Sequence, residues 1–296
     1  MPIAPSCLIC DAENLSSQRG MVAPFLAQRI WDRKPFATTL LICPDCGFQF
    51  FNPRLSEMEE RRLYQAYRGA DYQQMRHATE PWYTEKLNSS LSSPPTMAKR
   101  KKLVSDALAG NLPFGSIRNV LDFGGARGEL IDGLIPGAQG FVYDIGDVPP
   151  LPRIKVVALG DKQPFDLVIC SNVFEHVASP RLLLQQIVTF CSDGTFVFIE
   201  VPQESPDELP TKVKRVAQAG ILTLARPRTA LDVLRLRTTV VMHEHLNFYS
   251  PESLRRLLLT APGMRIVAEG GYRMAGSSPT IWILAQLGAA QPQESV

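Results

Sequence analysis

Short apolar runs separated by polar segments dominate the chain from residue 119 onward. These runs show little alternation of apolar and polar residues, which is typical of strands buried on both faces of a parallel sheet. Their length also fits strands better than helices. The predicted strands cover residues 119–123, 140–143, 154–158, 165–170, 195–201, 265–268 and 280–287.

Helical segments lie between these strands. Ser179-Pro180 and Ser250-Pro251 each supply an N-cap and a proline for the first helical turn. Residues 97–108 form another predicted helix of the same part of the chain. Strands that alternate with helices predict a doubly wound α/β domain with a Rossmann-like, seven-stranded sheet.

A stretch rich in serine and proline, residues 89–95, predicts a connector. We therefore expect a small N-terminal module over residues 1–55. A helical, tyrosine-rich connector follows over residues 56–95, and the main domain covers residues 96–290.

The composition is that of an ordinary globular protein. Of 296 residues, 45% are hydrophobic and 20% are charged, and the net charge is +2. This near-neutral balance gives no reason to expect a nucleic-acid partner or a charged membrane surface. No apolar stretch reaches the roughly 18–20 residues that span a bilayer, and the first residues do not read as a secretory signal. We expect a cytoplasmic protein whose six cysteines are reduced thiols or metal ligands.

A glycine-rich turn follows the first predicted strand of the main domain. The sequence from Val120 to Leu130 reads VLDFGGARGEL, with Gly124, Gly125 and Gly128 in the turn. Small residues let a backbone turn sharply and approach a ligand closely. In an open α/β sheet, ligands bind outside the carboxyl ends of the strands. The pattern predicts a ligand site at this turn, with a helix after it.

Two acids indicate which ligand binds there. Asp144 lies at the end of the second predicted strand, about 20 residues after Asp122. A carboxylate at this position can accept hydrogen bonds from ribose hydroxyls. Asp122 precedes Gly124 by two residues. A carboxylate at that position repels phosphate but suits a cationic amino-acid group. The sequence therefore favours S-adenosylmethionine, which carries a sulfonium and an amino group, over a dinucleotide.

These segments together resemble the class I S-adenosylmethionine-dependent methyltransferases over about residues 97–290. The resemblance rests on residues 120–128, 141–144, 164–172, 175–177 and 196–202. It implies that Asp122 and the turn glycines hold the methionine end of the cofactor and that Asp144 holds the ribose. It also places Asp161 near the adenine and Asn172 beside the donor methyl. Ala126 stands where many members have glycine.

Four cysteines in the first 46 residues form two Cys-x-x-Cys pairs, Cys7 with Cys10 and Cys43 with Cys46. Two such pairs can complete a tetrahedral Zn²⁺ site with no open coordination position, so we expect a structural zinc in a zinc-ribbon-like module. The gap between the pairs exceeds the roughly 15–20 residues of compact zinc ribbons. Reduced thiols without metal are the alternative.

The best candidate for proton transfer is the segment His243-Glu244-His245. If this segment is extended, the two histidines share one face and Glu244 takes the other. Histidine is suited to proton transfer near neutral pH, and a carboxylate could orient it. We expect His245 as the base and Glu244 as its partner, with a purely structural loop as the alternative.

The N-terminal cysteines, followed by Phe51-Asn52-Pro53-Arg54 and a tyrosine-rich segment, resemble the start of sugar methyltransferases that act in deoxysugar and polysaccharide pathways. Some of these methylate carbon and carry Tyr-His-Glu-His near the chemistry; here Met242 replaces the tyrosine. Members of that group usually have a further C-terminal α/β domain, which we do not expect in this chain. The tyrosines either close over a substrate or pack between domains: Tyr64, Tyr67, Tyr72 and Tyr83.

The resemblance implies a sugar or nucleotide-sugar acceptor. Four arginines of an insertion between predicted strands could bind its phosphates: Arg226, Arg228, Arg235 and Arg237. Other acceptors stay open, namely another small molecule, a lipid or a protein, as does a binding protein without catalysis. Residues 99–102, Lys-Arg-Lys-Lys, are expected to form a solvated helix face.

Overall fold

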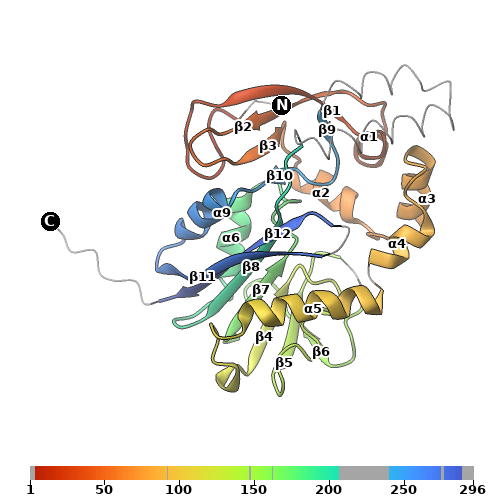
Figure 1. The fold of residues 1–296 in the computed structure, drawn as a ribbon. Coiled ribbons are helices and arrows are strands. Elements are labelled where there is room, and N and C mark those ends of the chain that lie inside the picture. The colour runs from red at the N-terminus through yellow and green to blue at the C-terminus, as the bar shows by residue number, and fades with distance from the viewer. Residues whose placement is uncertain are drawn as a thin grey trace.

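The computed structural model describes residues 4–91, 93–146, 148–161, 163–206, 240–274 and 277–288. These residues form two sheets, and the N-terminal one lies beyond the carboxyl end of the larger one (Figure 1). The four arginines predicted to face the acceptor lie outside the described residues: Arg226, Arg228, Arg235 and Arg237. Within the described part of the chain, no helix combines the length and the apolar character needed to cross a bilayer.

The larger sheet has seven strands in the order β11-β12-β8-β7-β4-β5-β6. Strands β4 to β8 run parallel, and β12 is antiparallel to both β8 and β11. The predicted seven-stranded doubly wound sheet is thus confirmed. The strands are β4 (Asn119–Phe123), β5 (Gln139–Tyr143), β6 (Ile154–Val156), β7 (Leu167–Ser171), β8 (Phe196–Pro202), β11 (Met264–Arg273) and β12 (Pro279–Leu287).

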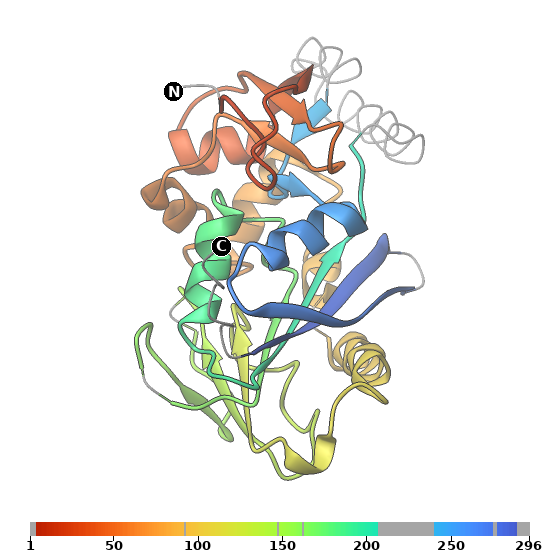
Figure 2. The ribbon, with the colours of Figure 1, turned by 90° about the vertical axis from the view of Figure 1, so that its left-hand side faces the viewer.

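Helices cover both faces of this sheet (Figures 1 and 2). Helix α5 (Pro94–Leu108) packs on one face, where its apolar side chains join those of alternate strand residues. Helices α6 (Pro180–Val188) and α9 (Pro251–Leu259) pack on the other face. Residues of the central strands β4, β7 and β8 are buried on both sides, which explains why their sequences are largely apolar. A 3-10 turn, η1 (Phe114–Ser116), leads into β4.

The predicted helix after the glycine turn does not form. Residues 129–135 make a series of turns instead, although Leu130, Ile131, Leu134 and Ile135 are buried. Gly133 has a φ of 72° within this stretch, and a left-handed residue interrupts a right-handed helix. The apolar residues of this stretch are therefore buried as in a helix, but the backbone is not helical.

The N-terminal sheet takes strands from two distant parts of the chain. Its order is β10-β3-β2-β1-β9, in which β9 is parallel to β1 and β10 is antiparallel to β3. Consecutive strands alone would not predict this sheet, because two of its members come from residues 240–248. The elements are β1 (Ser16–Val22), α1 (Pro24–Trp31), β2 (Ala37–Ile42), β3 (Gln49–Asn52), β9 (Val240–Met242) and β10 (Asn247–Phe248).

Three helices connect the two sheets: α2 (Glu57–Tyr64), α3 (Ala70–Thr79) and α4 (Glu85–Leu91). Most of the serine- and proline-rich stretch expected as a connector is helical, since α4 ends at Leu91 and α5 begins at Pro94. The tyrosines of this region pack among themselves, with Tyr72 in edge contact with Phe25, Tyr67 and Tyr83.

A single half-buried arginine connects the N-terminal sheet, the large domain and the segment between β9 and β10. The Arg54 guanidinium donates hydrogen bonds to the carbonyls of Phe51, Val177, Ala178 and Leu246 and to Asn247 Oδ1. Burial lowers its pKa to about 10. These acceptors belong to three separate chain segments, so one planar group fixes their relative positions.

We expect Arg54→Lys to lower the free energy of unfolding by about 2–4 kcal/mol, because an ammonium cannot reach the same set of acceptors and leaves buried carbonyls unpaired. Urea unfolding followed by tryptophan fluorescence measures the change. Arg61→Lys is the matched control, since Arg61 pairs with Glu57 on the exposed side of α2 and its change should cost less than about 0.5 kcal/mol. Equal effects of the two substitutions would contradict this role of Arg54.

Candidate active site

The glycine turn lies where the strand order of the large sheet reverses, since β5 and β7 flank β4 on opposite sides. Gly124 and Gly128 have φ values of 76° and 74°, which glycine adopts without strain. A Cβ on Gly124 would lie 2.7 Å from Val173, and one on Gly128 would lie 2.8 Å from Ile154. The turn is therefore tightly packed and depends on both glycines. Such a reversal is where open α/β sheets bind ligands.

The carboxyl group of Asp122 packs against this turn at Gly125. A Cβ on Gly125 would lie 2.0 Å from the Asp122 carboxyl carbon, so only glycine fits there. Asp122 is buried, and among the described residues its Oδ2 has no hydrogen-bond partner. Burial raises the pKa of Asp122 to about 7. A buried carboxylate oxygen without a donor suits a cationic or hydrogen-bonding group of a ligand.

Asp144 connects the end of β5 to the same turn. Its Oδ2 accepts a hydrogen bond from the Ala126 backbone at 2.8 Å, and its Oδ1 accepts one from the Gly146 backbone at 2.7 Å. Each oxygen keeps a second lone pair for a ligand. Asp161 lies further out, where its carboxylate accepts from the Ala158 backbone after β6.

Asn172 follows β7 in a left-handed conformation, with a φ of 54°. Its backbone N–H donates to the Glu200 carbonyl at 3.0 Å, which ties it to the neighbouring strand β8. The structure thus brings Asp122, Asp144 and Asn172 to the carboxyl ends of three adjacent parallel strands. Their assignment to parts of the cofactor stays a prediction.

The segment His243-Glu244-His245 crosses from β9 to β10 and docks on the turn after β7. The backbone N–H groups of Leu246 and Asn247 donate to the Glu175 carbonyl at 2.7 and 3.0 Å. His176 Nδ1 lies 3.1 Å from the Glu244 carbonyl. The segment that carries the predicted base is therefore held against Glu175 and His176, which follow β7.

The carboxylate in contact with His245 is not the one predicted. His245 Nδ1 lies 2.8 Å from Glu204 Oε2, whereas Glu244 forms an ion pair with Arg76 at 2.6 Å. Burial disfavours the charged ring. However, the hydrogen bond and charge of Glu204, with Glu175 and Glu244, raise the pKa of His245 to about 9. Glu244 therefore acts on His245 through its charge, because its side chain points to α3.

The third predicted residue, His243, points away from His245. Its Nδ1 lies 3.2 Å from Glu80 Oε1, and Glu80 also pairs with Arg76. The two histidines do not share a face as an extended segment would require, since residues 243–246 are not in a strand. His243 thus belongs to a charge network with the connector helices.

Sequence reasoning left His176 and Glu175 without a firm role, yet both contact this site. The His176 and His245 rings are 4.8 Å apart, and the acceptor and donor atoms of Glu175, His176 and His245 lie within 4.8 Å of one another. Burial lowers the pKa of His176 to about 3, so its ring is neutral. With Nδ1 facing the Glu244 carbonyl, the proton is on Nδ1 and Nε2 is left as an acceptor.

Three buried polar atoms around these rings have no hydrogen-bond partner within the described ranges: Tyr64 Oη, Glu175 Oε2 and Glu244 Oε1. The Tyr64 ring contacts His176 at 5.7 Å. Burial raises the pKa of Glu175 and of Glu244 to about 7 each. Buried polar groups in native proteins are nearly always paired, so this set of atoms is suited to a polar ligand.

The expected solvated helix face at residues 99–102 is only partly solvated. Arg100 reaches Ser171 Oγ at 2.6 Å, and Lys101 donates to the Asp132 carbonyl at 2.6 Å. Lys102 pairs with Asp106 on the exposed side. One arginine of this basic run, Arg100, therefore faces the carboxyl end of β7, which its sequence context did not indicate.

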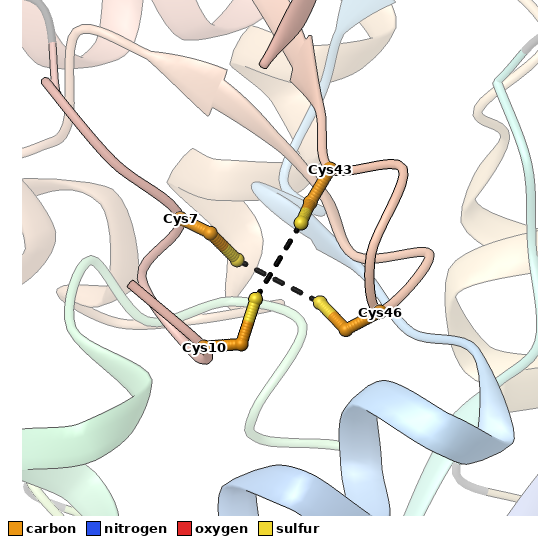
Figure 3. A group of neighbouring side chains, drawn as sticks. All are labelled: Cys7, Cys10, Cys43 and Cys46. Carbon is orange, nitrogen blue, oxygen red and sulfur yellow. Dashed lines mark hydrogen bonds between the residues drawn. The ribbon is translucent and has the colours of Figure 1, made fainter. Parts of the chain in front are cut away.

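The four N-terminal cysteines converge as the spacing predicted (Figure 3). Cys7 Sγ lies 3.7 Å from Cys46 Sγ, and Cys10 Sγ lies 3.5 Å from Cys43 Sγ. Four sulfurs at about 2.3 Å from a tetrahedral zinc lie about 3.8 Å apart, so the cluster fits that ion. Ser250, the N-cap of α9, donates to the Cys46 carbonyl and connects the cluster to the large domain.

Comparison with known proteins gives the family. Residues 96–269, more than half of the chain, match the model of the methyltransferase domain family. The chain belongs to this family, which confirms the predicted class of enzyme, an S-adenosylmethionine-dependent methyltransferase.

A curated relative is the ubiquinone biosynthesis O-methyltransferase of Shewanella halifaxensis (strain HAW-EB4). It is 26% identical over 167 residues, which cover 50% of this chain and 63% of the relative. The matched region thus spans less than two thirds of that protein.

Solved structures include human N-acetylserotonin methyltransferase in complex with S-adenosylmethionine. It is 18% identical with a TM-score of 0.41, and the match covers 74% of this chain and 68% of that one. Magnesium protoporphyrin IX methyltransferase from Synechocystis PCC 6803, with bound S-adenosylhomocysteine, is 15% identical with a TM-score of 0.42. That match covers 64% of this chain and 82% of the other.

We expect Gly128→Ala to lower the free energy of unfolding by about 2–4 kcal/mol, because it adds a left-handed alanine and a clash with Ile154. Gly137→Ala is the matched control. Gly137 has a φ of 78° but nothing within 4 Å of its would-be Cβ, so it should cost only the backbone strain of about 1 kcal/mol. Chemical unfolding of the two variants measures both values. If both lost the same amount, packing at the turn would not be the cause.

Proposed function

We propose that this enzyme transfers the methyl group of S-adenosylmethionine to a sugar or nucleotide-sugar acceptor that binds against His245. The observation that carries the proposal is the set of unpaired buried atoms around the two histidine rings, Tyr64 Oη, Glu175 Oε2 and Glu244 Oε1. A polyhydroxylated acceptor offers several donors and acceptors to such a set, whereas an apolar acceptor would leave it unpaired.

The residues at the strand ends fit the methyl donor. Asp122, with its unpaired oxygen, would face the cationic methionine end, and Gly124, Gly125 and Gly128 would let the backbone approach it. Asp144 would accept from the ribose hydroxyls. When bound, the cofactor supplies an electrophilic methyl carbon on a sulfonium. We place the adenine toward Asp161 and the methyl toward Asn172.

His245 would take the proton of the acceptor. The acceptor held against His245 would be the nucleophile for the methyl group that the donor supplies. The acceptor's proton moves to His245, whose Nδ1 is fixed by Glu204 and whose other nitrogen is then the base. Glu244 would stabilise the imidazolium by its charge, and Arg76 would fix Glu244. His243 would fix the segment through Glu80.

A second candidate acceptor comes from the curated relative, which acts in ubiquinone biosynthesis. A direct test offers nucleotide sugars and a precursor of ubiquinone biosynthesis to the zinc-loaded enzyme and measures S-adenosylhomocysteine production. Turnover with nucleotide sugars supports the first acceptor class, and turnover with the precursor alone would reject it.

We expect His245→Gln to lower kcat by about 10²–10⁴, the range of general base catalysis, with little change in donor affinity. Because the base must be neutral and its pKa is about 9, wild-type kcat/KM should rise as the pH goes from 7 toward 9. The variant should lose that rise.

Initial rates across this pH range and a calorimetric titration of the donor measure the two quantities. His77→Gln is the control, since His77 contacts the Tyr83 carbonyl away from this site. A His245→Gln enzyme with full activity and the same pH profile would reject the base.

We also infer that the four cysteines hold one structural zinc ion, as the sulfur separations support. Its function would be to stabilise the N-terminal sheet, and through β9 and β10 to place His245. Thiolates are deprotonated when they bind the ion, so the metal contributes to folding of this small module.

Cys46→Ser should abolish zinc binding and lower methyl transfer by at least about tenfold, because loss of the N-terminal sheet releases both strands that flank His245. Donor affinity should fall much less, since the glycine turn belongs to the other sheet. Zinc content, turnover and donor titration are measured together, with Cys191→Ser as the control. Full turnover in a zinc-free variant would contradict the positioning role.

A further inference from the structure

A second polar cluster lies on the α5 side of the large sheet, apart from the histidines. Its centre is Glu200 on β8, which is 1% exposed. Its carboxylate accepts hydrogen bonds from Ser171 Oγ and from Tyr272 Oη, and Arg100 Nη2 lies 3.6 Å away. Arg100 also donates to Ser171 Oγ at 2.6 Å. Sequence analysis gave Glu200 no role.

Asp122 faces the same cluster. In the parallel register, Asp122 pairs with Ile169, and Ser171, two residues further along β7, pairs with Glu200. Paired residues and residues two apart point to the same face of a sheet, so these side chains lie on one face. Arg100 and Glu200 both act electrostatically on Asp122, the first lowering its pKa and the second raising it.

The formal charges of this cluster do not cancel. Asp122 and Glu200 carry two negative charges when ionised, and Arg100 carries one positive charge. A ligand with one net positive charge would complete the balance, and among the described residues Asp122 Oδ2 has no hydrogen-bond partner. Two buried carboxylates that share one arginine are costly unless a further cation compensates them.

The methyl donor and its product differ by one charge. The donor carries a sulfonium, an ammonium and a carboxylate, for a net charge of +1, whereas the product has lost the sulfonium charge and is neutral. The Glu200 carbonyl accepts from the Asn172 backbone at 3.0 Å, so β8 lies beside the residue that the proposed function places at the donor methyl. The Glu200 carboxylate would then attract the sulfonium charge that the reaction removes.

We propose that Glu200, with Asp122 and Arg100, makes the cofactor site selective for the positively charged methyl donor over its neutral product. Transfer of the methyl group leaves the cluster with one uncompensated negative charge, which favours release of S-adenosylhomocysteine. This inference rests on the proposed function, since it requires that the cofactor binds at the glycine turn.

The test compares two ligands rather than one. The dissociation constants of S-adenosylmethionine and S-adenosylhomocysteine are measured by calorimetry on the full, zinc-loaded chain. In Glu200→Gln, the affinity for the donor relative to the product should fall by about three- to tenfold compared with wild type, the effect of removing one unit charge from the cluster at the effective dielectric constant of a protein. Glu200→Asp keeps the charge and should keep the wild-type ratio even if both affinities decrease.

Glu80→Gln is the matched control, because Glu80 is also 1% exposed and ion-paired but lies on the α3 side. It should leave the ratio unchanged. If both ligands weaken equally in Glu200→Gln, Glu200 only supports the fold and the inference is overturned. The inference is also overturned if Glu200→Asp lowers the affinity for the donor relative to the product as much as Glu200→Gln does. If wild type binds neither ligand, the proposed function itself fails, which is a different result.

Discussion

The pairing of residues 240–248 with the N-terminal sheet is the constraint on which the rest of the site depends. Strand β9 pairs with β1 and β10 pairs with β3, so both ends of a short segment are held by backbone hydrogen bonds. Between them, His245 turns toward the large domain and contacts Glu204. The same segment is anchored from the other side by the Glu175 carbonyl. The proposed base, which lies outside regular structure, is thereby fixed from two directions.

This arrangement gives the N-terminal module a function beyond its own stability. The cysteine cluster fixes the loop that leads into β3, and the Cys46 carbonyl accepts from the N-cap of α9. Arg54 then joins β3 to the turn after β7 through the Val177 and Ala178 carbonyls. The donor side and the acceptor side of the proposed reaction are built on different sheets, so their alignment depends on these few contacts.

Buried charge is concentrated on both sides of the proposed methyl position. On one side, Glu175 and Glu244 surround His245. On the other, Arg100 pairs with Glu200 and acts electrostatically on Asp122. Each of these two clusters holds more carboxylates than cationic side chains. A cluster of this kind lowers the stability of the fold unless a ligand compensates its charge. The imbalance is consistent with a site that binds a cation and removes a proton.

The sequence by itself determined the sheet, the glycine turn and the cysteine cluster, because each is encoded locally. Continuous apolar runs require burial on both faces, Gly124 and Gly128 follow β4 directly, and each Cys-x-x-Cys pair is a single turn. Only the tertiary structure decided the partners of distant residues. Glu204 rather than Glu244 contacts His245, and Arg100 faces Glu200 across about 100 positions of sequence, because strand order and not chain order determines which side chains meet. The prediction of a helix after Gly128 was wrong for a related reason. The spacing of apolar residues specifies which side chains are buried, but it does not specify the backbone conformation.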